Sequence, residues 1–161
     1  MLIFRFGWAK PVPINSRYYK HPKRDLIIVS VAGPITNLVL AFIGCLLERI
    51  AETALKGISF QSGSFAYTFF SFLLTFLYLF TILNVSFCIF NLLPIPPLDG
   101  SRLLTVLLPL KWQMKFIQYE RYIAIGLIVL LWLGLLSRPL QFLVTKTMYG
   151  MNWIISLLPF L

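Results

Sequence analysis

The chain has 161 residues, of which 59% are hydrophobic, and its mean hydropathy is +0.86. Charged residues make up 12% of the chain, against about 25% in soluble domains. This composition excludes an ordinary soluble domain and predicts an integral membrane protein in which residues 1–161 form a single membrane domain. The net charge is +9, but the basic residues lie beside the apolar runs. We therefore expect them to orient membrane spans, and we expect no nucleic-acid partner.

Residues 1–24 are basic and rich in proline and aromatic residues. Pro11, Pro13 and Pro22 exclude one continuous helix, because proline inside a helix removes a backbone hydrogen bond and clashes with the preceding turn. The alternation of apolar and polar residues from Ile3 to Ala9 predicts short extended pieces or a hairpin near the membrane surface.

The first predicted span runs from Leu26 to Leu47 and contains no charged residue. At a rise of about 1.5 Å per residue, a helix of this length covers a hydrocarbon core of about 30 Å. Gly33, Pro34 and Asn37 interrupt the apolar run. One interpretation is an ordinary packing kink in which Asn37 makes a structural hydrogen bond, and the other is a functional polar group within the span.

A second charge-free run, from Phe65 to Leu93, predicts the next span. Pro94, Pro96 and Pro97 then end the helix, because proline and the residue before it disfavour helical backbone. The chain should therefore run in non-helical conformation up to Asp99. Non-helical backbone at membrane depth is tolerated only where it is buried in protein or lines a wet cavity, so this segment is a candidate site.

Asp99 is the most informative residue of this segment. A carboxylate at the edge of the hydrocarbon layer is costly unless it is paired, metal-bound or hydrated, so such a residue marks a candidate functional site. The sequence around it, Pro97-Leu98-Asp99-Gly100, also suits a turn. Asp99 could therefore simply cap a helix that begins near Ser101.

The rest of the chain contains three more helical candidates. Residues 102–121 are predicted to form a short interfacial helix, and residues 122–136 a short third span that Arg138 and Pro139 end. Residues 148–161 are apolar but too few for a full crossing, which predicts an interfacial helix or a partial span. The predicted fold is thus an all-α membrane protein with about three transmembrane helices, an interfacial helix and a short extended N-terminal segment.

Lysine and arginine are distributed unevenly among the segments between the spans. They are most frequent in residues 1–24 and 94–121, and sparse in residues 48–64 and after residue 136. Because cytoplasmic loops carry the excess of basic residues, the N-terminus and the Asp99 end of the second span are expected on the cytoplasmic side.

Three segments separated by spans carry a more specific signal. They are Phe-Gly-Trp-Ala-Lys-Pro-Val-Pro-Ile-Asn at 6–15, Ala-Gly-Pro-Ile-Thr-Asn at 32–37 and Asn-Leu-Leu-Pro-Ile-Pro-Pro-Leu-Asp-Gly at 91–100. In this order they resemble the site-2 protease family of intramembrane zinc metalloproteases, particularly its compact bacterial and archaeal members. The resemblance implies a protein of the bacterial plasma membrane that cleaves transmembrane helices within the lipid bilayer.

The resemblance also implies a zinc cofactor and roles for individual residues. In the family, two histidines of a His-Glu-x-x-His motif and one aspartate bind zinc, and three protein ligands leave one position for a water molecule. Asp99 matches the zinc-binding aspartate. Asn37 matches a motif asparagine near the catalytic centre, where its amide could donate to a substrate carbonyl or to the developing oxyanion. Asn91 could help to shape the pocket.

No His-Glu-x-x-His occurs in the 161 residues, and the single histidine is His21. His21 lies in a basic, proline-bounded stretch and is expected to be a solvated loop residue, because ligation would need a helical pair of histidines. The chain is therefore expected to be the C-terminal part of a site-2 protease, with two of the three ligands missing.

Two other functions remain open from the sequence. A non-catalytic homologue that binds membrane helices or a partner would also lack the motif. A small transporter or channel component would fit an intramembrane aspartate, but it predicts more polar residues along the spans. Nothing in the pattern indicates an oligomeric state.

Overall fold

The computed structural model describes residues 21–56, 58 and 63–158. These residues form five α-helices and no strand: α1 (Pro22–Leu55), α2 (Phe65–Asn91), α3 (Asp99–Leu107), α4 (Leu110–Trp132) and α5 (Ser137–Ser156). The prediction of an all-α membrane fold is confirmed. The extended segment predicted near the N-terminus lies outside the described residues.

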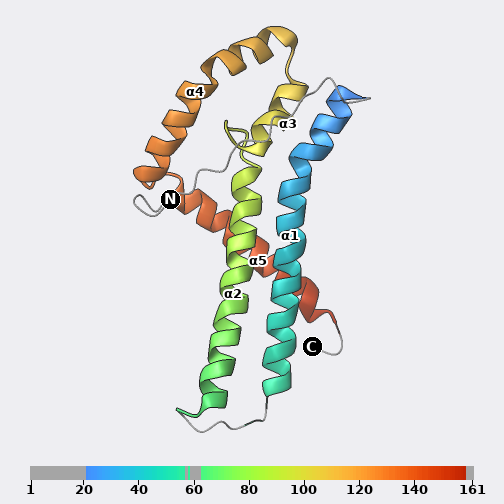
Figure 1. The fold of residues 1–161 in the computed structure, drawn as a ribbon, viewed down its shortest axis with the longest axis vertical. Helices are drawn as coiled ribbons and strands as arrows, with labels where there is room; N and C mark the ends of the chain where they lie inside the picture. The colour runs from blue at the N-terminus through green and yellow to red at the C-terminus, as the bar shows by residue number, and fades with distance from the viewer. Residues whose placement is uncertain (1–20, 57, 59–62, 159–161) are drawn as a thin grey trace.

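The two long helices α1 and α2 lie side by side and antiparallel along the longest axis of the molecule (Figure 1). Both are long and apolar enough to cross a membrane. The predicted span 26–47 lies within α1, which continues through Pro34 as one helix. The predicted span 65–93 matches α2, whose N-cap Ser64 accepts a hydrogen bond from the backbone N–H of Tyr67.

The segment predicted as one interfacial helix, residues 102–121, is divided between two helices. α3 ends at Leu107 and α4 begins at Leu110, with Pro109 as the N-cap of α4. Proline disfavours helical backbone in the residue before it, which explains the break. The bounds predicted for the third span, 122–136, differ from those of α4, which begins at Leu110 and ends at Trp132 without a break.

The C-terminal part also differs from the prediction. Pro139 does not end a helix but lies in the first turn of α5, where its missing N–H leaves no helical hydrogen bond unmade. α5 then runs to Ser156, so residues 148–156 of the segment predicted as a separate helix form its second half. α4 and α5 meet at a bend of 81°, and together they meet the length and hydropathy of one broken span or a re-entrant loop. Gly134 lies in this bend with a φ of +70°, a conformation that glycine adopts at little cost.

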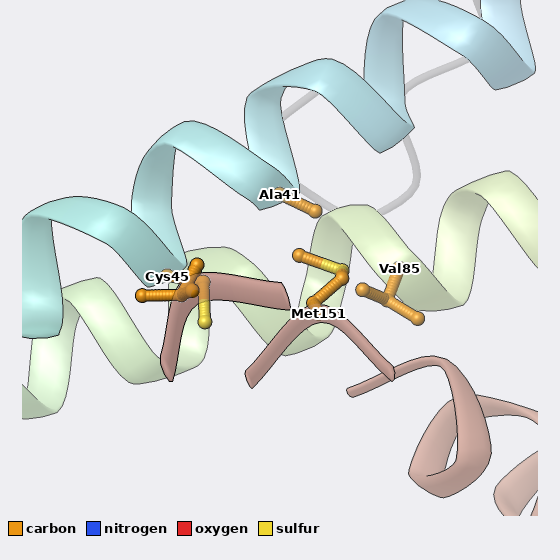
Figure 2. Packing of buried hydrophobic residues seen from close by; sticks show 5 residues of the cluster. Ala41, Cys45, Val85 and Met151 are labelled. Atoms are coloured by element: carbon orange, nitrogen blue, oxygen red, sulfur yellow. The ribbon is translucent and has the colours of Figure 1, made fainter. Parts of the chain in front are cut away.

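The buried core lies where α5 crosses the α1–α2 pair. Figure 2 shows Ala41 and Cys45 of α1, Val85 of α2 and Met151 of α5 packed together, and Ile155 completes the cluster. The Cys45 Sγ also donates a hydrogen bond to the Asn152 Oδ1 at 3.5 Å. α5 is thus held across the two long helices by apolar contacts and by one thiol–amide hydrogen bond. The side chains of α1 and α2 that it contacts also pack against each other.

Candidate functional site at the junction of α1 and α3

The chain between α2 and α3 is a compact, non-helical connection, as predicted from its prolines. Backbone N–H groups of Leu93, Ile95 and Leu98 donate to the carbonyls of Phe90, Leu93 and Ile95. Pro96 is fully buried. The connection therefore satisfies much of its own backbone and carries the chain directly from the end of α2 into α3.

Asp99 is the first residue of α3, and its carboxylate is half-buried. The N-cap is Leu98, which offers no side-chain hydrogen bond, so Asp99 is not the cap of a helix beginning near Ser101. Ser101 instead donates its hydroxyl to the Leu98 carbonyl at 2.7 Å. Among the described residues, Asp99 has no hydrogen-bond or ion-pair partner. Its position in the first turn is still favourable, because the N-terminal end of a helix carries partial positive charge.

Gly100 explains how α3 can begin so close to the end of α2. A Cβ added at this residue would collide with the backbone carbonyl oxygens of Leu92 and Leu93. Backbone atoms cannot turn aside as a flexible side chain can, so position 100 requires glycine. Gly100 and Ser101 are both buried. The start of α3, and with it the Asp99 backbone, is thereby fixed against the C-terminal end of α2.

The other wall of the site is α1. A Cβ added at Gly33 would lie 3.3 Å from the Asp99 Oδ2, so the carboxylate lies directly against the α1 backbone. Asn37 follows Gly33 by four residues and therefore lies on the same face of α1, about one turn away. The structure thus brings the predicted ligand Asp99 and the motif segment of α1 to one junction, although 66 positions of sequence separate Gly33 from Asp99.

The other candidate residues lie around this junction without direct bonds to it. The Asn37 side chain is half-exposed and has no hydrogen-bond partner among the described residues, so the structural hydrogen bond considered for it is not seen there. Asn91 is the last residue of α2 and is half-buried. His21 is exposed at the N-cap of α1, where its backbone N–H donates to the Asp25 carboxylate at 3.2 Å.

A zinc site needs about three protein ligands, and this requirement can be tested on the described part of the chain. No group of three or more His, Cys, Asp or Glu residues lies together there. Asp99 is a single oxygen ligand facing a glycine. The described residues therefore do not by themselves form a zinc site, and Asp99 can supply only one part of such a site.

Comparison with known proteins decides the family. The sequence profile of Peptidase family M50 matches residues 7–134, which is most of the chain. The chain belongs to peptidase family M50. This result confirms the resemblance to site-2 proteases, and the apolar helices and the family together indicate an integral membrane protein of the metallopeptidase type.

The chain is also similar to a curated protein of Bacillus subtilis (strain 168) that bears the name "Putative zinc metalloprotease YwhC". The two are 39% identical over 131 residues, which cover 81% of this chain and 55% of the relative. The chain thus spans about half the length of the curated relative. No solved structure gives a significant match.

The structure adds one residue that the sequence pattern did not single out for the site. In the sequence, Gly33 is notable only because it interrupts an apolar run beside Pro34, whereas the structure places it against the Asp99 carboxylate. A weak signal did exist, since Gly33 belongs to the same short segment as Asn37. A sequence cannot say which turn of α1 faces α3, so the contact itself could only come from the fold.

Proposed function

We propose that this chain carries the aspartate-bearing part of the active site of an intramembrane zinc metalloprotease, with Asp99 as a zinc ligand. The observation that carries the proposal is the close approach of the Asp99 carboxylate to Gly33, which brings the motif segments 32–37 and 91–100 together. Membership of peptidase family M50 and similarity to a protein named as a zinc metalloprotease support it.

The substrates of such an enzyme would be transmembrane helices. Both long helices expose large apolar side chains along most of their length, as expected of surfaces that face lipid or another membrane helix. Asn37 would contact the substrate or the developing oxyanion, since its amide is half-exposed one turn from Gly33. Lysine and arginine are most frequent in residues 1–24 and 94–121, the segments nearest the site in the sequence. This bias favours placement of the site at the cytoplasmic side of a bacterial plasma membrane.

The remaining zinc ligands must come from residues other than those that the structure brings together around Asp99. A test follows directly from this requirement. The chain is purified in detergent, alone and joined in frame to an upstream segment that carries His-Glu-x-x-His, and zinc content and cleavage of a model transmembrane helix are measured. We expect stoichiometric zinc and cleavage only in the joined protein.

Asp99→Ala in the joined protein should abolish both zinc retention and cleavage. Ser101→Ala, on the same helix end, is the matched control, because it removes a structural hydroxyl and no ligand. Retained zinc and cleavage after Asp99→Ala would refute the ligand role, and stoichiometric zinc in the chain alone would refute the division of the site.

A second candidate function is a non-catalytic membrane protein that binds other helices. The observation that favours it is the absence of any cluster of three metal-ligating residues within the described part of the chain. The coding DNA upstream of the Met1 codon discriminates between the two. An in-frame His-Glu-x-x-His there supports the protease, whereas a stop codon followed by a promoter supports the binding protein.

A further inference from the structure

We propose that Gly33 is a positioning residue for the Asp99 carboxylate. The missing side chain at position 33 leaves the space against α1 that the carboxylate occupies, and so sets the direction in which Asp99 points from α3. This inference takes its functional meaning from the proposed function of Asp99, but it concerns only the described residues of α1 and α3.

The contact at Gly33 is selective. A Cβ at this position would have the Asp99 Oδ2 at 3.3 Å, and no other described atom outside the neighbouring backbone of α1 would lie within 4 Å. A separation of 3.3 Å is tighter than ordinary van der Waals contact, so one of the two groups must shift. Among the described residues, a methyl group added at position 33 would therefore press on the Asp99 carboxylate alone.

The backbone offers no other reason for glycine at this position. Gly33 lies inside α1 in helical conformation, where glycine is less favourable than alanine by about 1 kcal/mol. Glycine is thus unfavourable for the helix at this position, and the Asp99 Oδ2 is the group of the described residues that a side chain here would meet. We infer that the glycine is there to accommodate this oxygen.

The carboxylate, rather than the helix, should yield to a larger residue at position 33. Gly100 holds the start of α3 against the backbone carbonyls of Leu92 and Leu93, and Ser101 is buried beside it. The Asp99 backbone is thus fixed from the α2 side. An alanine at position 33 would rotate the Asp99 side chain away from α1 while leaving α3 in place.

Two other helical glycines provide matched controls. A Cβ at Gly44 would lie 2.6 Å from the Thr81 Oγ1 and 2.8 Å from the Phe80 Cδ1, so Gly44 is a contact between helices. A Cβ at Gly126 would meet nothing within 4 Å among the described residues. The three positions therefore separate a contact with a carboxylate, a contact between helices and open space.

The first experiment is a double-mutant cycle on the whole chain in detergent, read as the midpoint of thermal unfolding by circular dichroism. Gly33→Ala should raise the midpoint by about 2–4 °C in the Asp99→Ala background, because alanine is the better helix former. In the native background and in Asp99→Asn, which keeps the shape of the side chain, the same change should raise the midpoint less or lower it. Gly126→Ala should shift all three backgrounds equally. A shift caused by Gly33→Ala that is the same in all three backgrounds would overturn the proposal.

The second experiment separates movement of one side chain from movement of the helix. In a protein with Cys45→Ala and Cys88→Ala, single thiols are introduced by Asp99→Cys or by Thr105→Cys, the latter on the same helix. Gly33→Ala should change the rate of maleimide labelling severalfold at position 99 and leave the rate at position 105 unchanged. Equal changes at both positions would mean that α3 moves as a body, and the proposal would be wrong.

Neither experiment uses a metal ion or peptide cleavage. The positioning role can therefore fail while Asp99 remains a zinc ligand, and it can hold if the chain proves to be a non-catalytic homologue.

Discussion

Gly44 of α1 and Thr81 of α2 are in such close contact that a Cβ on Gly44 would lie 2.6 Å from the Thr81 Oγ1. Thr81 is fully buried, and its hydroxyl donates to the Leu77 carbonyl at 2.9 Å. Small residues allow membrane helices to approach closely, and such contacts replace the hydrophobic driving force that lipid removes. Among the described residues, Gly44 is therefore the glycine that lets α1 and α2 approach each other closely.

Gly44→Ala should weaken the pairing of α1 and α2. Forcing a methyl group into a filled interface costs about 1–3 kcal/mol, and the helix preference of alanine recovers only part of that loss. The free energy of unfolding is measured by titration with sodium dodecyl sulfate and circular dichroism. Gly126→Ala is the control and should be neutral or stabilising; equal effects of the two changes would contradict the assigned contact.

Gly100→Ala should disturb the start of α3 without affecting the α1–α2 core. The added Cβ meets two backbone carbonyl oxygens, so the connection between α2 and α3 must open. Hydrogen exchange measured by mass spectrometry should then become faster in residues 92–101 and stay unchanged in residues 77–88. Unchanged exchange in residues 92–101 would show that the connection accommodates a side chain there.

The two long helices could be predicted from sequence because charge-free runs are a sufficient signal for spans. The polar ends of α1 were missed, since charged residues beyond the hydrocarbon core do not end a helix. Pro109 and Pro139 show why the C-terminal part was harder. Both lie at the beginnings of helices, where proline is favourable, and a sequence does not reveal whether a proline begins a helix or ends one.

The sequence singled out candidate site residues, but it could not predict how they lie relative to one another. Asp99 stood out because a carboxylate beside an apolar run is costly, and its half-buried position at the start of α3 agrees with that reasoning. Its contact with Gly33 depends on how α3 lies against α1. That arrangement arises from the packing of Gly100 on α2, which no periodicity in the sequence reports.

Met151→Ala should loosen α5 from the α1–α2 pair. Met151 is 6% exposed in the core cluster, and truncation of a buried Met to Ala costs about 2–5 kcal/mol. Cys45, at 3% exposure, reports the loss, because it becomes accessible to maleimide when α5 dissociates. Trp153→Ala is the matched control, since Trp153 is 65% exposed on the same helix. Equal labelling of Cys45 in both variants would contradict the described packing.

Asn37→Ala should separate stability from activity. The Asn37 side chain has no hydrogen-bond partner among the described residues, so its removal should change the unfolding free energy by less than about 0.5 kcal/mol. In the chain joined to a His-Glu-x-x-His segment, the loss of an oxyanion donor should lower kcat by about 10²–10³-fold. Thr36→Val, one residue earlier, should leave kcat intact. An undiminished kcat in Asn37→Ala would exclude a direct catalytic contact.

The bend at Gly134 supplies most of its own hydrogen bonds. The N–H groups of Leu133, Gly134, Leu135 and Ser137 all donate to carbonyls within residues 129–134. A chain reversal of this kind exposes few bare amides, so it can enter an apolar phase without carrying water with it. The bend of 81° between α4 and α5 is thus compatible with a position inside the bilayer, because the turn leaves few backbone groups that would need water.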